Sequence, residues 1–305
     1  MSNKKVSDLV NELESTYAYK PSQDRIIQLP EVNRVGLELV GFRDYAQHKR
    51  IMIIGNKEIA FLKTMEKQAI TEAFQFLLTE QTPCIIVTRG NTIPDEVKEV
   101  ATKKEVSIIN WNGSTSRLLL RLFDILDEWF APSQLIYGTL MSIYGIGVLI
   151  KGPSGIGKSE IALELMKKGH TLVSDDSVQV KLYDNTLVGS APPLIQNMIE
   201  IRGVGILDVT QLFGHRIITE QADIDFIVEL SKWDKDLKYE RVGTTRNIET
   251  ILGVDIVKIT LPVSEGRSMS EVIEVSVINF KLQEKGINSA ELFAARIENQ
   301  LKEKK

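Results

Sequence analysis

The sequence predicts an α/β protein with two domains, the second of which carries a phosphate-binding loop. A chain of 305 residues is long enough for two domains that each have a core. Short apolar runs of strand type alternate with amphipathic helical patterns, which is the order that an α/β fold requires. One apolar run leads into a glycine-rich turn and then into a helix, which is the context of a phosphate-binding loop.

The composition indicates a soluble globular protein. Of the residues, 43% are hydrophobic and 26% are charged, and a net charge of −4 with interspersed signs gives no support for nucleic-acid or anionic-membrane binding. The single cysteine, Cys84, lies in an apolar run, so we expect a buried thiol and no intramolecular disulfide. The polar first residues are no signal peptide, and no apolar run is long enough to span a membrane. We therefore expect a cytoplasmic protein.

Residues 1–131 are predicted to form a small α/β domain. Strand patterns cover residues 50–55, 83–90 and 107–111, and helical patterns cover residues 6–13, 67–78, 94–103 and 114–130. This half contains no nucleotide loop, metal-ligand cluster or nucleophile–base pair, which favours a role in regulation or assembly over chemistry. Pro132 follows the last helical pattern, so we place the boundary there and assign residues 132–305 to a catalytic domain.

The second half opens with strand patterns at residues 135–142 and 144–150, which we expect to be two strands of one sheet. A phosphate-binding loop follows, and the residues expected to bind the donor are Gly152, Pro153, Ser154, Gly155, Ile156, Gly157, Lys158 and Ser159. Its glycines allow backbone N–H groups to approach phosphates, and the N-terminus of the next helix favours negative charge. In such loops the lysine reaches the β- and γ-phosphates, and the serine hydroxyl ligates Mg²⁺.

Carboxylates at two later positions could complete a metal and phosphate site. Residues 170–176 form a short apolar run that ends in Asp175 and Asp176, which is typical of a Walker-B strand but also of a capped turn. Glu200 begins a run with two glycines, Gly203 and Gly205. It could ligate Mg²⁺, or it could be a surface residue of a bulged strand.

The remaining polar residues favour phosphoryl transfer. Arg241 and Arg267 each lie close to a glycine, where an arginine can stabilise developing charge or simply be solvated. None of the three histidines lies in a recognisable metal or triad arrangement, which disfavours a zinc hydrolase and a Ser-His-Asp enzyme. A charged amphipathic helix is predicted for residues 289–305.

With these motifs in order, the sequence resembles the bifunctional HPr kinase/phosphorylase family, which acts on a seryl residue of the phosphocarrier protein HPr. The resemblance covers nearly the full length and is most specific in the second half. It rests on residues 144–150, 169–176, 200–209, 239–243, 265–267 and 272–280, and more weakly on residues 34–38 and 83–89.

The resemblance implies a catalytic domain related to phosphoenolpyruvate carboxykinase, in a hexamer whose C-terminal helices reach a neighbour and HPr. It implies Mg²⁺-dependent phosphorylation of HPr by ATP or pyrophosphate, with a regulatory role in carbon metabolism. It also implies the reverse phosphorolysis of the phosphoserine by inorganic phosphate, which gives pyrophosphate.

Individual roles follow from the same resemblance. The matching positions are Lys158 for the catalytic lysine, Ser159 and Glu200 for the Mg²⁺ ligands, Asp176 for the base that takes the seryl proton, Arg241 for a catalytic arginine and residues 263–268 for a loop needed in dephosphorylation. Tyr137 departs from the pattern, because the family usually has a catalytic histidine there. A tyrosine can donate a hydrogen bond but cannot supply the positive charge of a histidine near neutral pH.

Two other interpretations share the phosphate loop. One is a small-molecule or carboxykinase-like kinase, against which the run after Glu200 and the first domain argue. The other is a nucleotide-sensing regulator with impaired phosphorylase activity, suggested by Tyr137 and opposed by the presence of Lys158, Asp176 and Glu200. The preferred phosphoryl donor and any allosteric effector stay open at this point.

Overall fold

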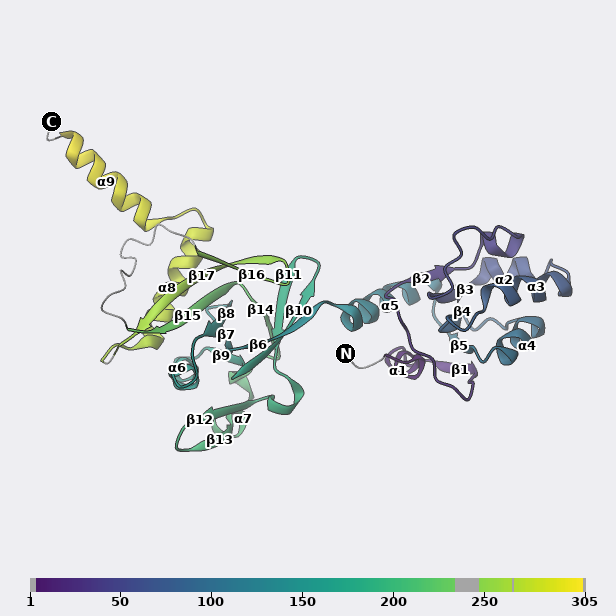
Figure 1. Cartoon of the computed structure of the whole chain (residues 1–305), viewed down its shortest axis with the longest axis horizontal. Coiled ribbons are helices and arrows are strands. Elements are labelled where there is room, and N and C mark those ends of the chain that lie inside the picture. The colour runs from purple at the N-terminus through teal and green to yellow at the C-terminus, as the bar shows by residue number, and fades with distance from the viewer. Residues whose placement is uncertain (1–3, 234–246, 265, 304–305) are drawn as a thin grey trace. The chain divides into compact units, whose positions relative to one another are not determined.

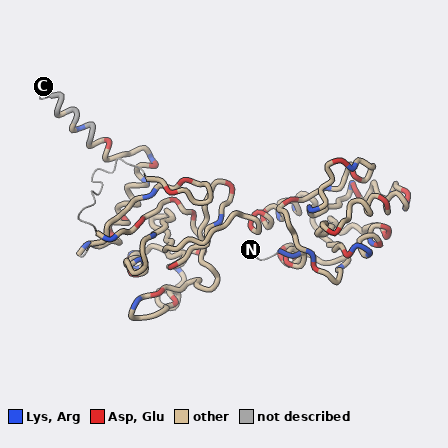
Figure 2. Tube along the Cα trace, in the orientation of Figure 1, with Lys and Arg blue, Asp and Glu red and all other residues tan. Residues whose placement is uncertain are grey.

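The computed structural model describes residues 4–233, 247–264 and 266–303 (Figure 1). The chain divides into two compact units, Met1–Ala131 and Pro132–Lys305. Basic and acidic residues are interspersed along both units, as Figure 2 shows. In the described parts of the chain, every helix is too short or too polar to cross a membrane.

The first unit contains one five-stranded sheet. Its elements are α1 (Val6–Glu12), β1 (Thr16–Tyr19), β2 (Val32–Arg34), η1 (Leu37–Val40), β3 (Ile51–Ile54), α2 (Asn56–Leu62), α3 (Lys67–Leu77), β4 (Cys84–Thr88), α4 (Asp95–Lys103), β5 (Ser107–Trp111) and α5 (Thr115–Phe130). The strand order is β1-β5-β4-β3-β2, in which β2 to β5 are parallel and β1 is antiparallel to β5. The strands and helices predicted for this half are confirmed, whereas β1, β2 and α2 had no clear sequence pattern.

Both faces of this sheet are covered, which explains why its strands are apolar throughout. In β3, Met52 and Ile54 pack with α2, α3 and α4 on one face, while Ile51 and Ile53 pack with α1 and α5 on the other. Cys84 belongs to the second cluster and is fully buried, as expected. Burial raises the pKa of its thiol, so the group stays neutral at physiological pH.

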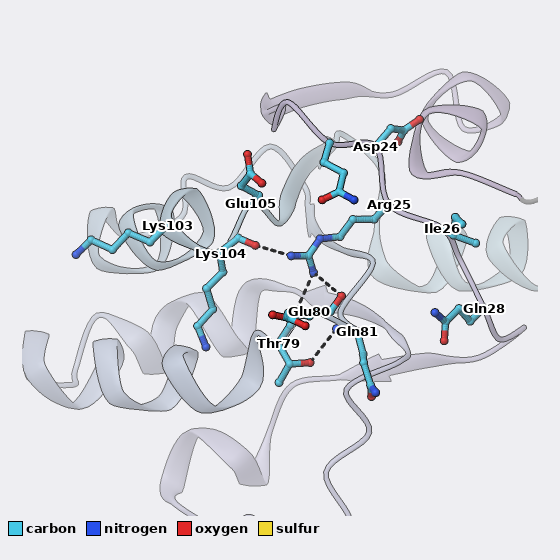
Figure 3. Close-up of a pocket in the computed structure, with 11 residues that line it drawn as sticks. Asp24, Arg25, Ile26, Gln28, Thr79, Glu80, Gln81, Lys103, Lys104 and Glu105 are labelled. Carbon is cyan, nitrogen blue, oxygen red and sulfur yellow. Dashed lines mark hydrogen bonds between the residues drawn. The ribbon is translucent and has the colours of Figure 1, made fainter.

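Arg25 joins the C-terminal ends of two helices in this unit (Figure 3). Its guanidinium donates to the carbonyl oxygens of Thr79 at 2.7 Å and Thr82 at 2.6 Å, which follow α3. It also donates to the carbonyl oxygen of Lys104, which follows α4. These carbonyls belong to the segments just after the two helices, where the backbone makes no helical hydrogen bonds and the helix C-termini favour a cation. Arg25, Thr79 and Lys104 line a cavity of about 800 Å³, in which Arg25 already uses its donors on the protein itself.

Arg25→Ala is expected to lower the free energy of unfolding by about 2 kcal/mol, because carbonyl groups lose a charged donor and only partly regain water. Arg25→Lys should recover part of this loss, since an ammonium keeps the charge but not the planar fork. Thermal unfolding compared with the exposed control Arg117→Ala measures the effect. Equal stability of the Arg25→Ala and Arg117→Ala proteins would contradict it.

The described residues of the second unit form three sheets. Its strands are β6 (Ser133–Tyr137), β7 (Thr139–Ile143), β8 (Ile146–Lys151), β9 (Thr171–Ser174), β10 (Ser177–Tyr183), β11 (Thr186–Ser190), β12 (Met198–Ile201), β13 (Gly205–Asp208), β14 (Gln221–Asp223), β15 (Phe226–Lys232), β16 (Asn247–Ile251) and β17 (Val254–Val263). Its helices are α6 (Lys158–Lys167), η2 (Pro193–Ile195), α7 (Val209–Phe213), η3 (His215–Ile217), α8 (Met269–Glu284) and α9 (Ser289–Glu303). The last of these agrees with the predicted C-terminal helix over its described residues.

A six-stranded sheet of order β16-β17-β15-β8-β7-β9 forms the centre of this unit. One face packs against α6 and α8, and the other packs against a four-stranded sheet of order β14-β11-β10-β6. The hairpin β12–β13 is a sheet of its own. β8 and β15 are parallel, with Ile150 opposite Val228, so their carboxyl ends lie at the same edge.

The prediction of a single strand over residues 135–142 is wrong. Gly138 divides this segment into β6 and β7, which belong to different sheets, so β6 does not share the sheet of β8. A Cβ atom on Gly138 would lie 2.8 Å from the carbonyl oxygen of Ile150, and only glycine allows this close approach. The approach depends on a distant strand, which the local pattern does not report.

Glu274 on α8 contacts side chains from the segment that follows α6 and from the turn between β7 and β8. Its carboxylate accepts hydrogen bonds from Lys168 Nζ at 2.6 Å and from the Tyr144 hydroxyl at 3.0 Å, and His170 Nε2 lies 3.0 Å away. Partial burial by itself would raise the pKa of Glu274, but these partners together outweigh it and lower the pKa to about 2. The ionised carboxylate is therefore part of the folded state.

A carboxyl group whose pKa is lower in the folded state stabilises the fold at pH values above its unfolded pKa. This stabilisation is lost on acidification. For Glu274 this contribution is complete above about pH 4.5 and disappears as the pH falls towards about 2. Glu274→Gln should lower the free energy of unfolding by about 1–3 kcal/mol at pH 7. Its difference from the unchanged chain should shrink between pH 4.5 and pH 2. Thermal unfolding over this range tests it, with the exposed Glu271→Gln as control; a pH-independent difference would contradict it.

Candidate active site

The phosphate-binding loop lies between the carboxyl end of β8 and the start of α6, as predicted. Its glycines have left-handed backbone angles, with φ of 143° at Gly152, 79° at Gly155 and 101° at Gly157. A Cβ atom on Gly152 would lie 2.7 Å from the carbonyl oxygen of Leu230 on β15. The loop geometry therefore depends on glycine both for its turn and for its packing against the neighbouring strand.

Lys158 is the first residue of α6, and its side chain folds back over the loop. Its Nζ donates to the carbonyl oxygens of Gly152 at 3.0 Å and Pro153 at 3.4 Å. This places a positive charge beside the helix N-terminus, where an anion is favoured.

The two adjacent aspartates after β9 have different surroundings. Asp175 is buried and accepts hydrogen bonds from the hydroxyls of Thr139 and Ser159, each at 2.7 Å. Asp176 is exposed, has a φ of 64°, and its side chain accepts no hydrogen bond from the described residues. A left-handed residue other than glycine is uncommon and frequently marks a functional position. Asp175 thus holds Ser159, whereas the Asp176 carboxylate has no hydrogen-bond donor among the described residues.

The hairpin β12–β13 brings two more charged side chains to the loop. Glu200 on β12 lies opposite Ile206 on β13, and the turn that follows begins with Arg202. The Arg202 guanidinium donates from Nη2 to the Ser154 hydroxyl at 3.2 Å. Sequence reasoning gave Arg202 no role, although it lies two residues after Glu200 and beside a glycine.

These residues surround a cavity of about 140 Å³. It is lined by Ser154, Gly155, Gly157, Lys158, Ser159, Glu160, Asp175, Asp176, Glu200 and Arg202. The structure therefore brings together the predicted loop, the aspartate pair and Glu200, from three separate parts of the chain.

One predicted position lies outside the cavity, and two are not among the described residues. Tyr137 does not line the cavity; its side chain is 74% exposed at the end of β6, opposite Ser177. It is nevertheless close to the aspartate pair along the backbone, because the N–H of Gly138 donates to the carbonyl oxygen of Asp176 at 2.9 Å. Arg241 lies outside the described residues, as does Glu265 in the predicted dephosphorylation loop.

The oxygen donors of the cavity suit a hard divalent cation. The Ser159 hydroxyl and the carboxylates of Asp175 and Glu200 line the same space, and Mg²⁺ prefers one or two such ligands together with water and substrate phosphates. Within the described residues, no group of three or more His, Cys, Asp and Glu side chains forms a complete metal cage. A metal site that takes its other ligands from a serine hydroxyl and from the substrate does not need such a cage.

Comparison with known proteins gave matches over both units. A family described as HPr Serine kinase N terminus matches residues 5–126, and one described as HPr Serine kinase C-terminal domain matches residues 128–297. The HPr kinase/phosphorylase of Bacillus mycoides (strain KBAB4) is 41% identical over 274 residues, which cover 90% of this chain and 89% of that protein. The HPr kinase/phosphorylase of Exiguobacterium sp. is 41% identical over 280 residues, covering 92% and 90%. A solved structure, the HPr(Ser) kinase/phosphatase from Coxiella burnetii, is 36% identical with a TM-score of 0.48 and covers 52% of this chain and 98% of that one.

Proposed function

Because this chain belongs to the HPr kinase/phosphorylase family, we propose that it phosphorylates a serine of HPr and removes the phosphoryl group again by phosphorolysis. The donor is ATP or pyrophosphate, and the reverse reaction consumes inorganic phosphate. The observation that carries this proposal is the cavity in which Lys158, Ser159, Asp176 and Glu200 meet. A phosphate loop, oxygen ligands and an unpaired carboxylate are what transfer to a hydroxyl requires.

In the forward reaction the loop N–H groups and Lys158 bind the donor phosphates. Ser159 and Glu200 would hold Mg²⁺, which neutralises charge on those phosphates. Asp176 accepts the proton of the seryl hydroxyl as its oxygen forms a bond to the terminal phosphorus. The bond from that phosphorus to the bridging oxygen breaks, and ADP or inorganic phosphate leaves.

In the reverse reaction an oxygen of inorganic phosphate attacks the phosphorus of the phosphoserine. The bond to the seryl oxygen breaks, Asp176 returns its proton to that oxygen, and pyrophosphate forms. One carboxylate serves both directions because phosphorolysis is the reverse of phosphorylation by pyrophosphate, and a reaction and its reverse share one transition state.

The roles of Asp175 and Asp176 follow from their environments. Both oxygens of Asp175 accept hydrogen bonds from hydroxyls, so this residue orients Ser159. The exposed Asp176 faces the cavity without such a partner among the described residues, which suits the proton acceptor. The support for Arg241 as a catalytic arginine is its match to the family pattern alone.

We further propose that residues 132–305 form the catalytic domain of a cytoplasmic homo-hexamer and that residues 1–131 serve regulation or assembly. Exposed apolar side chains on α9, namely Leu292, Phe293 and Ile297, support a helix that contacts another protein molecule.

Incubation of the chain with purified HPr, Mg²⁺ and either ATP or pyrophosphate tests the function. A charge-shift gel should show conversion of HPr to a more acidic form with at least one donor. Transfer of this product to inorganic phosphate should reverse the shift and release pyrophosphate. Nucleotide binding without any shift of HPr would favour a sensing regulator and contradict the proposal.

Tyr137→His is expected to raise phosphorolysis more than phosphorylation. Phosphorolysis brings inorganic phosphate and a phosphoserine together, and a nearby cation reduces the repulsion between the two anions. Tyr137 lies beside the backbone of Asp176, so a histidine there adds charge near the proton acceptor. Both rates measured at equal magnesium and phosphate concentrations give the ratio. An unchanged ratio would assign Tyr137 a packing or surface role.

A further inference from the structure

Arg202 occupies the tip of a hairpin that reaches the phosphate loop from a separate part of the chain. One side of the hairpin is fixed to the core, because Ile199 is buried and Ile201 and Leu207 pack against the cluster around α6. Glu200 projects from the strand that leads to the tip and lines the cavity. The hairpin thus holds Glu200 and Arg202 at the same cavity.

The guanidinium of Arg202 lies directly over the loop. Its Nη2 donates to the Ser154 hydroxyl at 3.2 Å, a long hydrogen bond to a neutral group. A Cβ atom on Gly155 would lie 2.5 Å from Nη1 and 3.0 Å from Cζ, so the absence of a side chain at Gly155 makes room for the guanidinium. No carboxylate among the described residues pairs with Arg202, which leaves donors available for a ligand.

The balance of charge around the cavity indicates a role for Arg202 in binding an anion. Four carboxylates line it, those of Glu160, Asp175, Asp176 and Glu200, against the two cations Lys158 and Arg202. The Lys158 ammonium already contacts two loop carbonyls. Even with the Mg²⁺ proposed at Ser159 and Glu200, four carboxylates and a polyphosphate carry more negative charge than that ion and one lysine neutralise.

We propose that Arg202 binds the terminal phosphate of the donor in phosphorylation and the pyrophosphate that forms in phosphorolysis. Its guanidinium leaves the Ser154 hydroxyl and donates to phosphate oxygens, for which its planar fork is suited. There it stabilises the charge that develops on the transferred phosphoryl group. This inference rests on the proposed function, since it assigns a residue to the same donor site.

Binding of Mg-pyrophosphate and Mg-ATP, measured by calorimetry in the absence of HPr, tests the inference independently of transfer to HPr. Arg202→Ala should weaken binding by about tenfold or more and lower kcat for HPr phosphorylation by about 10²–10³-fold. Arg202→Lys should lie between this variant and the unchanged chain, because it retains the charge without the fork. Arg216→Ala removes an exposed arginine of the same unit that does not line the cavity, and should change neither quantity more than twofold.

The outcomes separate this inference from the proposed function. Normal binding and turnover by Arg202→Ala, with an active unchanged chain, would overturn the role of Arg202 alone. An unchanged chain that binds neither donor would contradict both statements. Donor binding that depends on Arg202 in a chain that leaves HPr unmodified would support the phosphate contact and reject HPr as the substrate.

Discussion

Lys158→Ala is expected to abolish phosphorylation and phosphorolysis while the fold stays intact. Lys158 is the cation of the loop, and its Nζ lies over the carbonyl oxygens of Gly152 and Pro153 at the start of α6. Loss of one preorganised contact to the transferred phosphoryl group costs about 3–4 kcal/mol in the transition state, or about 10²–10³-fold in rate. Alanine is favourable in a helix, so α6 should form normally.

Initial rates in both directions, with circular dichroism as a check on folding, measure this effect. Lys167→Ala is a matched control, because Lys167 is exposed at the opposite end of the same helix and does not line the cavity. A Lys158→Ala protein that retains most of its HPr-phosphorylating rate would rule out this loop as the donor site.

Asp176→Asn is expected to abolish both reactions and to retain donor binding. An amide cannot accept the seryl proton, and loss of a general base typically lowers the rate by about 10²–10⁴-fold. Asparagine tolerates left-handed backbone angles, so it should keep the φ of 64° found at Asp176. Calorimetric binding of Mg-ATP separates the loss of chemistry from a loss of donor binding.

Asp175→Asn should behave differently. It replaces a buried acceptor of two hydroxyl donors by a group that can accept at one oxygen only. The expected result is weaker Mg-dependent donor binding and a loss of about 1–3 kcal/mol in the free energy of unfolding. If Asp175→Asn instead keeps donor binding and loses only chemistry, while Asp176→Asn stays active, the two roles are reversed.

Local patterns predicted the parts of the site that depend on neighbours in the sequence. The loop from Gly152 to Ser159 needs only its own glycines, a preceding strand and a following helix, and the structure contains all three. The pair Asp175 and Asp176 was also evident, but only the resemblance to the family, and no local pattern, distinguished the two residues. The structure adds a physical distinction, because the hydroxyls of Thr139 and Ser159 donate hydrogen bonds to the two carboxylate oxygens of Asp175.

Features that depend on distant segments were missed or mispredicted. The break at Gly138 reflects the close carbonyl oxygen of Ile150, and the strand pattern on either side reads as continuous without it. Arg202 acquires its position only because the hairpin β12–β13 packs its tip against the phosphate loop. The sequence signal available for Arg202 is the adjacent Gly203, and the same kind of signal pointed to Arg241 and Arg267.

Mass spectrometry of HPr after incubation with the chain, Mg²⁺ and ATP or pyrophosphate tests the central claim most directly. We predict that HPr gains one phosphoryl group on a single serine, and that inorganic phosphate removes it with formation of pyrophosphate. The Lys158→Ala protein should leave HPr unchanged under the same conditions. An unchanged HPr mass with the native sequence and both donors, from a chain that binds Mg-ATP, would contradict the account.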